Sequence, residues 1–524
     1  MLKTDITLGM KYKSEDLKNA ISNRLGIDKT EIFDEHLVRR TLDLSVSGEP
    51  CYRATVAFSV SAEREAGLLK MRKKVAREEA LLFTPPPFSA DFRPVVVGAG
   101  PAGLFAALTL AESGARPIVL ERGLPAEERA KKIKLFESLG ILDTECNVQF
   151  GEGGAGTYSD GKLKMGARDK YKMKVIDEFI SAGATEDIAY SSTAHLGTDR
   201  LPSIVSNIRK KIESLGGEVY FGTRLTDIEI REGSLASITY ERGGERVTEP
   251  CRALLLATGH SARDTVRMLF KSGLKMTPKG FGIGVRIEHP REYINSIVYR
   301  ESAPEIEESA TYHLVTHLTG GRSVYSFCMC PGGSVVAAAS EEGGIVTNGM
   351  SEHARMADNS NAALLVSVTP SDFPSDTALG GIELQEKIER GAYSLLDSYR
   401  APVTRLSGLF GADIAPVGTL PSYPRGCEPM PLESYLPTFV TEALGAAISD
   451  FDAWLPGYAF GDAVLTGPET RTTSPLRIER DPETLEALGA HGVYPVGEGA
   501  GYAGGIISSA TDGIRVAERL ILGS

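Results

Sequence analysis

The chain has 524 residues, of which 42% are hydrophobic and 24% are charged, and its formal net charge is −12 at pH 7. This length is too great for one compact core and predicts roughly two or three domains, while the composition excludes wholesale disorder. An acidic chain has no global field to attract nucleic acid or anionic lipid, and no apolar run is long enough to span a bilayer. The 6 cysteines are scattered and the first residues lack a signal-peptide pattern, which favours a reducing, cytoplasmic location.

The first 85 residues predict a small α+β module, because their β-α-β-β order suits a ferredoxin-like unit. Ser14 is the predicted N-cap of an amphipathic helix that ends near Gly26. A charged helix is expected over residues 62–82, and the prolines at 85–87 are expected to form a stiff connector. Alternating apolar and polar residues predict the strands of the module at 2–8, 38–46 and 52–60.

A dinucleotide-binding fingerprint follows the connector. The apolar strand at 94–97 runs directly into Gly98, Gly100 and Gly103, and an Ala/Leu-rich helix continues from them. Gly98 permits a tight turn, Gly100 leaves room for a pyrophosphate, and Gly103 lets the helix pack closely on the strand. Pro101 and Ala102 open that helix, whose N-terminus would face the phosphates. The alternative is a glycine turn in an ordinary β-α-β unit.

An acidic residue closes the same unit. Glu121 ends the second strand, 18 residues after Gly103, where its carboxylate could reach the ribose hydroxyls, and Arg122 follows it. An acid at this position disfavours a bound 2′-phosphate. The order of strand, glycines, helix, second strand and acid makes the fingerprint more specific than the glycine spacing alone.

A loop dense in glycine occupies residues 149–162. Exposed backbone N–H groups in such a loop can wrap a ligand, and its hydroxyls can add donors; the alternative is a flexible surface loop. Lys162 and Lys164 could neutralise a pyrophosphate. The loop contributes the following predicted cofactor residues: Gly154, Ala155, Gly156, Thr157, Ser159 and Lys162.

The middle of the chain changes from helical to strand patterns. The apolar run at 253–256 ends at Thr258 and Gly259, where a second crossover would return beside the nucleotide, and Leu225 is assigned to the same site. The stretch from 398 to about 485 is expected to be rich in loops. The remaining predicted elements are a helix at 200–216, hairpins at 225–256, mainly strands at 275–380, and a helix at 380–398.

The C-terminus has a second glycine turn between a strand at 492–496 and a helix at 507–522. Gly497 and Glu498 follow the strand, so that the carboxylate could accept hydrogen bonds from ribityl hydroxyls. Gly504, Gly505 and Ile506 place another helix N-terminus toward the site, where its dipole would stabilise negative charge on a reduced flavin. Together with the two preceding features, this turn favours FAD over NAD.

These motifs resemble the glutathione-reductase and p-hydroxybenzoate-hydroxylase type of FAD fold, and more narrowly the bacterial FAD-dependent dehydrogenases of unassigned substrate that carry a small N-terminal module. The matching stretches are 151–163, 328–333, 469–475 and 497–506, although the pattern has Ser where Thr473 stands. The resemblance implies an α/β, three-layer FAD-binding domain with an inserted β-rich substrate domain. We therefore expect the module at 1–85, the FAD-binding domain at 90–270 and 486–524, and the substrate domain at 271–485.

Four residues are candidates for the chemistry. Cys328 and Cys330 would share one strand face as a thiol pair near the flavin, or would simply pack there as small residues. Arg471 could bind an anionic substrate or a flavin carbonyl, or could stabilise a polar loop. His260 follows the turn at Thr258 and more often fills a supporting role. No spacing indicates a metal site, and the Cys-x-x-Cys pair of a disulfide reductase is absent from the first FAD helix.

The favoured function is an FAD-dependent oxidoreductase that transfers a hydride between flavin N5 and a small organic substrate. The absence of a second glycine fingerprint leaves NAD(P)H only as a transient reductant. A flavin monooxygenase, or a reductase acting on a prenyl-type double bond, stays open within the same fold. The alternative from another class is an RNA-modifying flavoprotein that uses the N-terminal module and its basic stretch at 64–77 for recognition. The sequence contains no signal for an oligomeric state.

Overall fold

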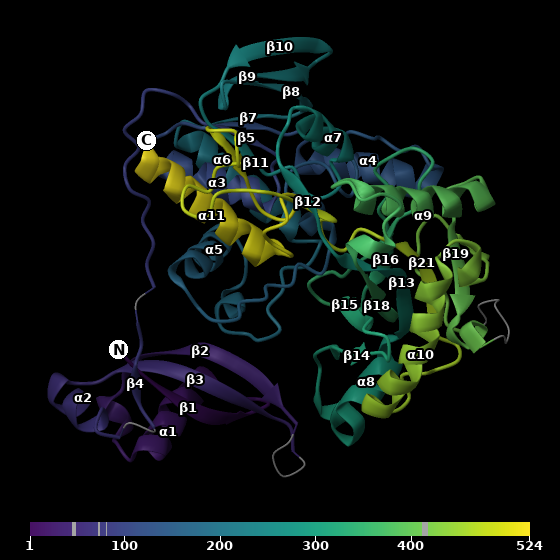
Figure 1. Cartoon of the computed structure of the whole chain (residues 1–524). Helices are drawn as coiled ribbons and strands as arrows, with labels where there is room; N and C mark the ends of the chain where they lie inside the picture. Colours follow the sequence, from purple (N-terminus) through teal and green to yellow (C-terminus); the bar gives the residue numbers. More distant parts are fainter. Residues whose placement is uncertain (45–48, 72–73, 80, 411–417) are drawn as a thin grey trace.

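The computed structural model describes the chain except for residues 45–48, 72–73, 80 and 411–417. It contains a parallel sheet, a large sheet that is mainly antiparallel, and a small N-terminal module at one side (Figure 1). This arrangement combines an α/β parallel sheet with additional antiparallel sheets, as the sequence predicts. No helix in the described part of the chain combines the length and the apolar character needed to cross a membrane.

The N-terminal module has the predicted ferredoxin-like order, with an antiparallel sheet ordered β2-β3-β1-β4. Helix α1 begins at Ser14, but Lys13 is its N-cap; Gly26 ends it in the left-handed conformation, as expected. Of the predicted strand at 38–46, residues 45 and 46 lie outside the described residues. The elements are β1 (Leu2–Gly9), α1 (Ser14–Leu25), β2 (Phe33–Asp43), β3 (Cys51–Ser59), α2 (Ala62–Leu68) and β4 (Ala76–Arg77).

The helix predicted over 62–82 is shorter in the structure, and residues 72, 73 and 80 of the predicted range lie outside the described residues. Helix α2 ends at Leu68, and the chain returns as β4, which pairs antiparallel with β1 through Leu2 and Arg77. Two interactions explain the difference. Val75 enters the core of the module, and the pairing gives β1 hydrogen-bonding partners on its second edge. Charge alternation alone therefore did not indicate a long helix.

The parallel sheet has the order β23-β11-β5-β6-β7. It therefore combines strands from residues 95–256 with one strand from residues 493–495. Helices α3, α5, α6 and α11 cover one face, and an antiparallel sheet of β8, β9 and β10 lies on the other. The bounds are β5 (Val95–Val97), α3 (Pro101–Glu112), β6 (Ile118–Leu120), α4 (Ala126–Leu139), α5 (Lys170–Ser181), α6 (Leu201–Ser214), β7 (Glu218–Tyr220), β8 (Thr223–Arg231), β9 (Ser234–Arg242), β10 (Glu245–Pro250), β11 (Leu254–Leu256), α7 (Arg263–Lys271), β23 (Val493–Pro495) and α11 (Ile506–Gly523).

The described residues between 276 and 478 form a seven-stranded sheet ordered β14-β15-β18-β13-β21-β19-β20, with its core against α8 and α10, and two two-stranded sheets, β12-β22 and β16-β17. The predicted division at residues 85, 270 and 485 stays a prediction. The bounds are β12 (Met276–Pro278), β13 (Phe281–Pro290), α8 (Arg291–Tyr299), β14 (Val315–His317), β15 (Ser323–Cys330), β16 (Ser334–Ala337), β17 (Thr347–Met350), β18 (Asn359–Val368), α9 (Gly380–Leu396), β19 (Ala401–Arg405), β20 (Cys427–Pro429), α10 (Thr438–Trp454), β21 (Val464–Glu469) and β22 (Leu476–Ile478).

The stretch expected to be loop-rich, from 398 to about 485, contains α10 and several strands of this sheet. Pro437 is the N-cap of α10, and Pro468 follows a cis peptide bond within β21. The prolines near the element boundaries made this stretch resemble a loop, although the Ala- and Leu-containing helix α10 lies between them. The sequence pattern therefore failed because proline can mark the start of a helix as well as a loop.

The N-terminal module docks on the rest of the molecule through Arg40. Its backbone N–H donates to Tyr190 O at 2.7 Å, and the N–H of Ser192 donates to Arg40 O at 2.9 Å. The Arg40 guanidinium lies 4.6 Å from the Tyr52 ring centroid and 5.5 Å from that of Tyr190. An arginine between two rings gains cation–π attraction on both sides, so this residue helps to fix the module in place.

Candidate functional site

A cavity of about 410 Å³ lies between the parallel sheet and the seven-stranded sheet. Its walls come from the ends of β5 and β11, the N-termini of α3 and α11, the 3-10 turn η2 (Ala155–Tyr158), and β15 and β21. Open parallel sheets bind ligands beyond the carboxyl ends of their strands, which is where this cavity lies. It is lined by these predicted cofactor residues: Gly98, Gly100, Pro101, Ala102, Glu121, Arg122, Gly154, Ala155, Gly156, Ser159, Lys162, Leu225, Thr258, Gly259, Glu498, Gly504, Gly505 and Ile506.

Three other predicted residues stand behind the wall. A Cβ on Gly103 would lie 1.8 Å from Gly98 O, so this glycine permits the close contact of helix and turn. A Cβ on Gly497 would lie 2.7 Å from the Cβ of Ala102. The Thr157 hydroxyl donates to Glu152 O at 3.4 Å and is not directed at the cavity as a ligand donor. These residues therefore shape the site through packing.

The first glycine turn leaves the N-terminus of α3 open. Gly98 has a φ of 104°, and a Cβ there would lie 2.3 Å from Ala257 O. Gly100 is the N-cap of α3 and provides no side chain to cap it, and Pro101 has no N–H to satisfy. The free N–H groups and the positive end of the helix dipole therefore face the cavity, as an anionic group requires.

Glu121 organises the backbone at this end of the cavity. Its carboxylate accepts hydrogen bonds from the N–H groups of Ala99 at 2.7 Å, Gly123 at 2.9 Å and Gly151 at 2.9 Å. An ionised carboxylate has about four lone-pair positions, so capacity for a ribose hydroxyl is left. The acid thus joins the first turn to the glycine-dense loop, a role that sequence spacing alone did not indicate.

The glycine-dense loop is held in place by internal contacts. Asp160 is fully buried and pairs with Arg355, whose Nε donates to Oδ1 at 2.9 Å. Ser159 Oγ donates to Gly156 O at 2.7 Å and accepts from Gly161 N at 3.0 Å. These contacts and the burial of Asp160 favour a defined loop over a flexible surface loop.

The second helix N-terminus belongs to α11. Gly505 is its N-cap and likewise provides no capping side chain. Glu498 lines the same end of the cavity, and burial raises its pKa to about 7 although Lys279 opposes the shift. A Cβ on Gly499 would lie 2.3 Å from Gly259 O, so the C-terminal turn sits against the turn that follows β11. Two segments about 240 residues apart thus form one wall.

The residues present fit FAD. Two helix N-termini without side-chain caps open onto one cavity, and a Cβ on Gly98, Gly103 or Gly499 would lie within 2.3 Å of a backbone oxygen. One helix end suits the pyrophosphate and the other suits the flavin ring, whose reduced form carries negative charge. Glu121 and Glu498 supply the acceptors for ribose and ribityl hydroxyls. This donor set is that of a dinucleotide site.

The predicted cysteine pair lies at the opposite wall. Cys328 lines the cavity, whereas Cys330 is fully buried behind it, and the Cys330 thiol donates to Cys328 O at 3.2 Å. Lys162 was predicted to neutralise a pyrophosphate, but it lies at this wall, where its Nζ donates to Met329 O. Lys164 lies 5.6 Å from the Phe327 ring centroid. Both lysines therefore accompany the cysteines on the side of the seven-stranded sheet.

His260 lines the cavity as a neutral side chain. Burial lowers its pKa to about 3, and the nearby cations Arg471 and Arg263 act in the same direction. Its Nδ1 is 3.0 Å from Ser261 Oγ, and its Nε2 is 4.0 Å from Glu498 Oε1. A neutral imidazole between these groups can donate or accept one hydrogen bond at the cavity wall.

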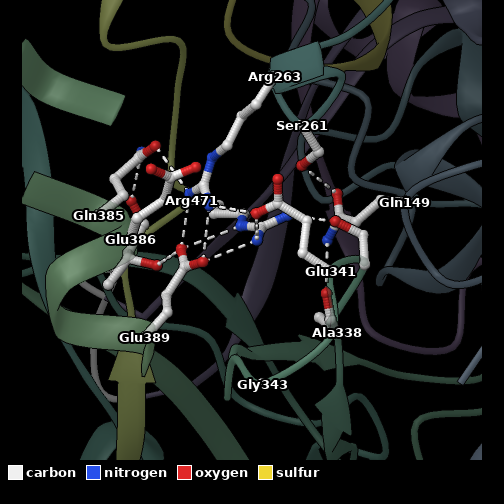
Figure 2. Close-up of polar contacts among 12 residues, drawn as sticks. Gln149, Ser261, Arg263, Ala338, Glu341, Gly343, Gln385, Glu386, Glu389 and Arg471 are labelled. Carbon is white, nitrogen blue, oxygen red and sulfur yellow. Dashed lines mark hydrogen bonds and ion pairs between the residues drawn. The ribbon is translucent and has the colours of Figure 1, made fainter. Parts of the chain in front are cut away.

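Arg471 belongs to a buried ion network (Figure 2). The Glu389 carboxylate lies between Arg471 and Arg263, accepting from Arg471 Nη2 at 2.7 Å and from Arg263 Nη2 at 2.7 Å. Arg471 Nη1 donates to Ser340 Oγ at 2.5 Å, and Glu341 lies 3.4 Å from Nη2. The sequence predicted that Arg471 could bind an anionic substrate, but its carboxylate partner in the structure is Glu389. Arg471 therefore presents only part of its surface to the cavity.

Further cavity residues were not predicted: Gln149, Ser261, Asn348 and Glu469 line it, and Arg286 lies directly behind them. Arg286 Nε donates to Glu469 Oε2 at 2.7 Å, and both side chains are buried. Glu469 and Asn348 come from separate segments, and no local spacing connects either with the glycine turns. In the described residues no group of three or more His, Cys, Asp or Glu is arranged to hold a metal.

Arg122 also differs from its prediction. Although it lines the cavity, its guanidinium pairs with Glu145 at 2.9 Å and Asp264 at 2.9 Å, and lies 4.2 Å from the Phe150 ring centroid. Its charge is therefore balanced within the protein. The side chain stiffens the rim of the cavity near Glu121.

Several solved structures resemble this chain at low similarity. A flavoprotein/dehydrogenase from Cytophaga hutchinsonii is 12% identical with a TM-score of 0.37, covering 82% of this chain and 79% of that chain. A geranylgeranyl bacteriochlorophyll reductase-like protein from Thermoplasma acidophilum is 12% identical with a TM-score of 0.35, covering 82% and 79%. E. coli quinol fumarate reductase FrdA is 13% identical with a TM-score of 0.36, covering 82% and 70%. At this level of similarity no reaction is inferred.

The sequence comparisons identify the cofactor. Residues 280–472 match the model of the FAD-dependent protein, C-terminal domain-like family, and residues 93–130 match the FAD binding domain. An uncharacterized protein of Clostridium beijerinckii is 44% identical over 528 residues, which cover 99% of this chain and 98% of that protein. The cofactor is FAD. The chain belongs to the same family as the C. beijerinckii protein, and it is an FAD-dependent protein with an FAD-binding domain and this C-terminal domain.

Proposed function

We propose that the protein is an FAD-dependent oxidoreductase that acts on a small organic substrate in the cavity between the two sheets. Bound FAD would accept or supply a hydride at flavin N5. The observation that carries the proposal is the pair of uncapped helix N-termini, of α3 and α11, that open onto a cavity whose far wall bears polar side chains. One wall can hold a dinucleotide, and the other is left for a substrate.

The residues of the glycine wall would bind and orient the cofactor. The N-terminus of α3 and the turn from Gly98 to Gly100 would hold the pyrophosphate, and Glu121 would accept a ribose hydroxyl. The N-terminus of α11 at Gly505 would stabilise negative charge on the reduced flavin. Because these groups are fixed by packing rather than by flexible side chains, little reorganisation would accompany the reaction.

The opposite wall would receive the substrate. Cys328, Asn348 and Thr472 line it, and together with Lys162 they offer a thiol, an amide, a hydroxyl and a cation. Glu498 has a pKa of about 7, so its carboxyl can hold or release a proton near neutral pH, whereas His260 stays neutral. We therefore assign proton transfer to Glu498 and a fixed hydrogen bond to His260.

We propose small molecules, rather than RNA, as the partners. In the basic stretch at 64–77, of which residues 72 and 73 lie outside the described part, two cations are paired with acids. Arg64 donates to Glu31 at 2.8 Å, and Arg77 lies 3.2 Å from Glu65. Paired cations at the surface have little charge left for a phosphate backbone.

Anaerobic absorption spectroscopy tests the proposed function. The flavin-loaded protein is mixed with NADH, with NADPH and with a panel of small organic substrates, and bleaching of the oxidised flavin band is recorded. Bleaching by a nicotinamide would indicate a transient reductant, and bleaching by a panel member would indicate direct oxidation of that substrate. Turnover that persists unchanged after FAD has been removed would contradict the proposal.

A further inference from the structure

The strand that carries the cysteine pair is interrupted by a bulge. In β15, Phe327 pairs with Ala363 of β18, but the register then shifts so that Cys330 pairs with Asn361. Cys328 lies in the shifted segment with a φ of 41°, a left-handed conformation that a non-glycine residue rarely adopts. Bulges occur beside active sites, where they redirect a side chain. Here the bulge brings Cys328 to the cavity while Cys330 stays buried.

Two cations hold the bulge in this conformation. Arg286 Nη1 donates to Cys328 O at 2.8 Å, and Lys162 Nζ donates to Met329 O. A Cβ on Gly349 would lie 2.5 Å from Arg286 Nη1, so this glycine leaves room for the guanidinium. Strained backbone persists where its surroundings fix it, and such positions cluster at functional sites.

The thiol chemistry of the pair differs from that of two other cysteines. Burial raises the pKa of Cys251 and of Cys427 to about 12. The pKa of Cys328 is lowered to about 6, chiefly by the adjacent Cys330 thiol, with Arg286 and Lys162 adding to the shift. The Cys330 thiol itself donates to Cys328 O at 3.2 Å.

Carboxylates also face the pair. Asp160, Glu469 and Glu498 lie within electrostatic range of Cys328 and oppose its ionisation. Asp160 is paired with Arg355, and Glu469 with Arg286, so their charges are largely compensated. The geometry therefore places the Cys328 side chain at the cavity and the Cys330 thiol directly behind it, against Cys328 O.

We propose that Cys328 and Cys330 form a redox-active dithiol that exchanges an electron pair with the FAD bound in the same cavity. In the oxidising direction the two sulfurs form a bond, the Cys330 S–H bond breaks, and that proton passes with two electrons to oxidised FAD. The reverse step breaks the sulfur–sulfur bond and restores a thiolate at Cys328 and a thiol at Cys330. The inference rests on the proposed function and adds a second two-electron centre to it.

Counting electrons tests this inference without an activity assay. The FAD-loaded protein is oxidised with diamide, freed of reagent, and titrated anaerobically with dithionite while the flavin band is followed. We expect the wild type to consume about two equivalents per FAD, because the disulfide and the flavin are each a two-electron couple. The C328S and C330S variants should each consume about one equivalent of dithionite per FAD, and their FAD content should be unchanged. C427S is the matched control, since Cys427 lies outside the cavity lining, and it should consume about two.

Alkylation and mass spectrometry give an independent result on the same samples. The oxidised wild-type peptide that contains residues 328–330 should resist alkylation and weigh less by two hydrogen atoms. Consumption of about one equivalent by the wild type, or alkylation of both sulfurs after diamide, would overturn the proposed dithiol. Protein that holds no FAD would overturn both the proposed function and the exchange, whereas one equivalent in protein that does hold FAD would overturn the exchange alone.

Discussion

The two walls of the cavity are built in opposite ways. The wall toward the parallel sheet is made of glycine turns and helix ends, where side chains have been removed so that backbone can approach a ligand. The wall toward the seven-stranded sheet contains buried charges in pairs, including Arg286 with Glu469 and Asp160 with Arg355. On the first wall, the backbone holds a cofactor that many proteins share. On the second wall, contacts to a substrate come from side chains, and neighbouring charged residues must hold those side chains in position.

The two walls also respond differently to substitution. A substitution at Gly98, Gly103 or Gly499 in the first wall fails through steric overlap, because the added Cβ would meet a backbone oxygen. A charged residue in the second wall fails through electrostatics, because its buried partner loses its compensating charge. The substitutions below separate these two modes of failure.

The largest effect is expected from Gly103→Ala in the glycine wall. The added Cβ would lie 1.8 Å from Gly98 O, so the turn must open and the purified protein should contain less than about a tenth of the normal FAD. The ratio of flavin to protein absorbance measures this loss. Gly391→Ala is the control, since a Cβ there meets nothing within 4 Å in α9 and should raise helix stability slightly. Normal FAD content in G103A would show that the turn tolerates a side chain.

Next in size is Glu389→Gln in the charged network of Figure 2. Removing the carboxylate leaves the cations of Arg263 and Arg471 buried, and we expect a loss of about 3–5 kcal/mol in unfolding free energy by guanidinium denaturation. Glu386→Gln is the matched control, because its partner Arg267 is 36% exposed and the pair should contribute below about 1 kcal/mol. Equal losses in the two variants would show that burial does not separate them.

The pH dependence of the same network has a definite sign. Burial acts to raise the pKa of Glu389, but Arg263 and Arg471 lower it well below its usual range. A depressed carboxyl pKa stabilises the fold above the pKa of the unfolded chain, and this stabilisation is lost as the pH falls through the folded value. The gap in unfolding free energy between wild type and E389Q should therefore be full at neutral pH and narrow in strong acid. A gap independent of pH would contradict the ionised state of Glu389.

Glu498 should show the opposite sign. Its folded pKa of about 7 is above the value in an unfolded chain, so the stabilisation is complete below the unfolded pKa and is lost as the pH rises through about 7. Flavin-free wild type should lose stability relative to Glu498→Gln between about pH 4.5 and 8. Thermal unfolding at a series of pH values measures the difference. Parallel curves for the two proteins would mean that the carboxyl is not buried in its neutral form.

The smallest effect is expected from Ser261→Ala, which lies where the two walls meet. Its hydroxyl donates to Gln149 Oε1 at 3.1 Å and contacts His260, so its loss should cost about 1 kcal/mol in denaturant unfolding. Ser203→Ala serves as the control, because that hydroxyl is exposed and bonds only the preceding turn. A loss above about 3 kcal/mol would indicate that the whole network depends on Ser261.

The difference between the walls also explains what sequence reasoning could find. Gly98, Gly100 and Gly103 lie close together in the chain, so their spacing alone predicts a strand, a turn and a helix that bind a dinucleotide. Asp160 and Arg355 are 195 residues apart, and Arg286 and Glu469 are 183 apart, so only tertiary structure brings each pair together. The sequence indicated Cys328 and Arg471 as polar residues of interest, but could not show that one faces the cavity while the other is neutralised by Glu389.

The central claim is that a single FAD is held between the Gly98 turn and the N-terminus of α11. Isothermal titration of the flavin-free protein with FAD, FMN and riboflavin tests it most directly. We predict one FAD per chain and an affinity for FMN at least about a hundredfold weaker, because FMN lacks the adenosine part that the β5–α3 turn would hold, a difference of about 2.7 kcal/mol. Equal affinities for FAD and FMN, or no saturable FAD binding, would contradict the claim.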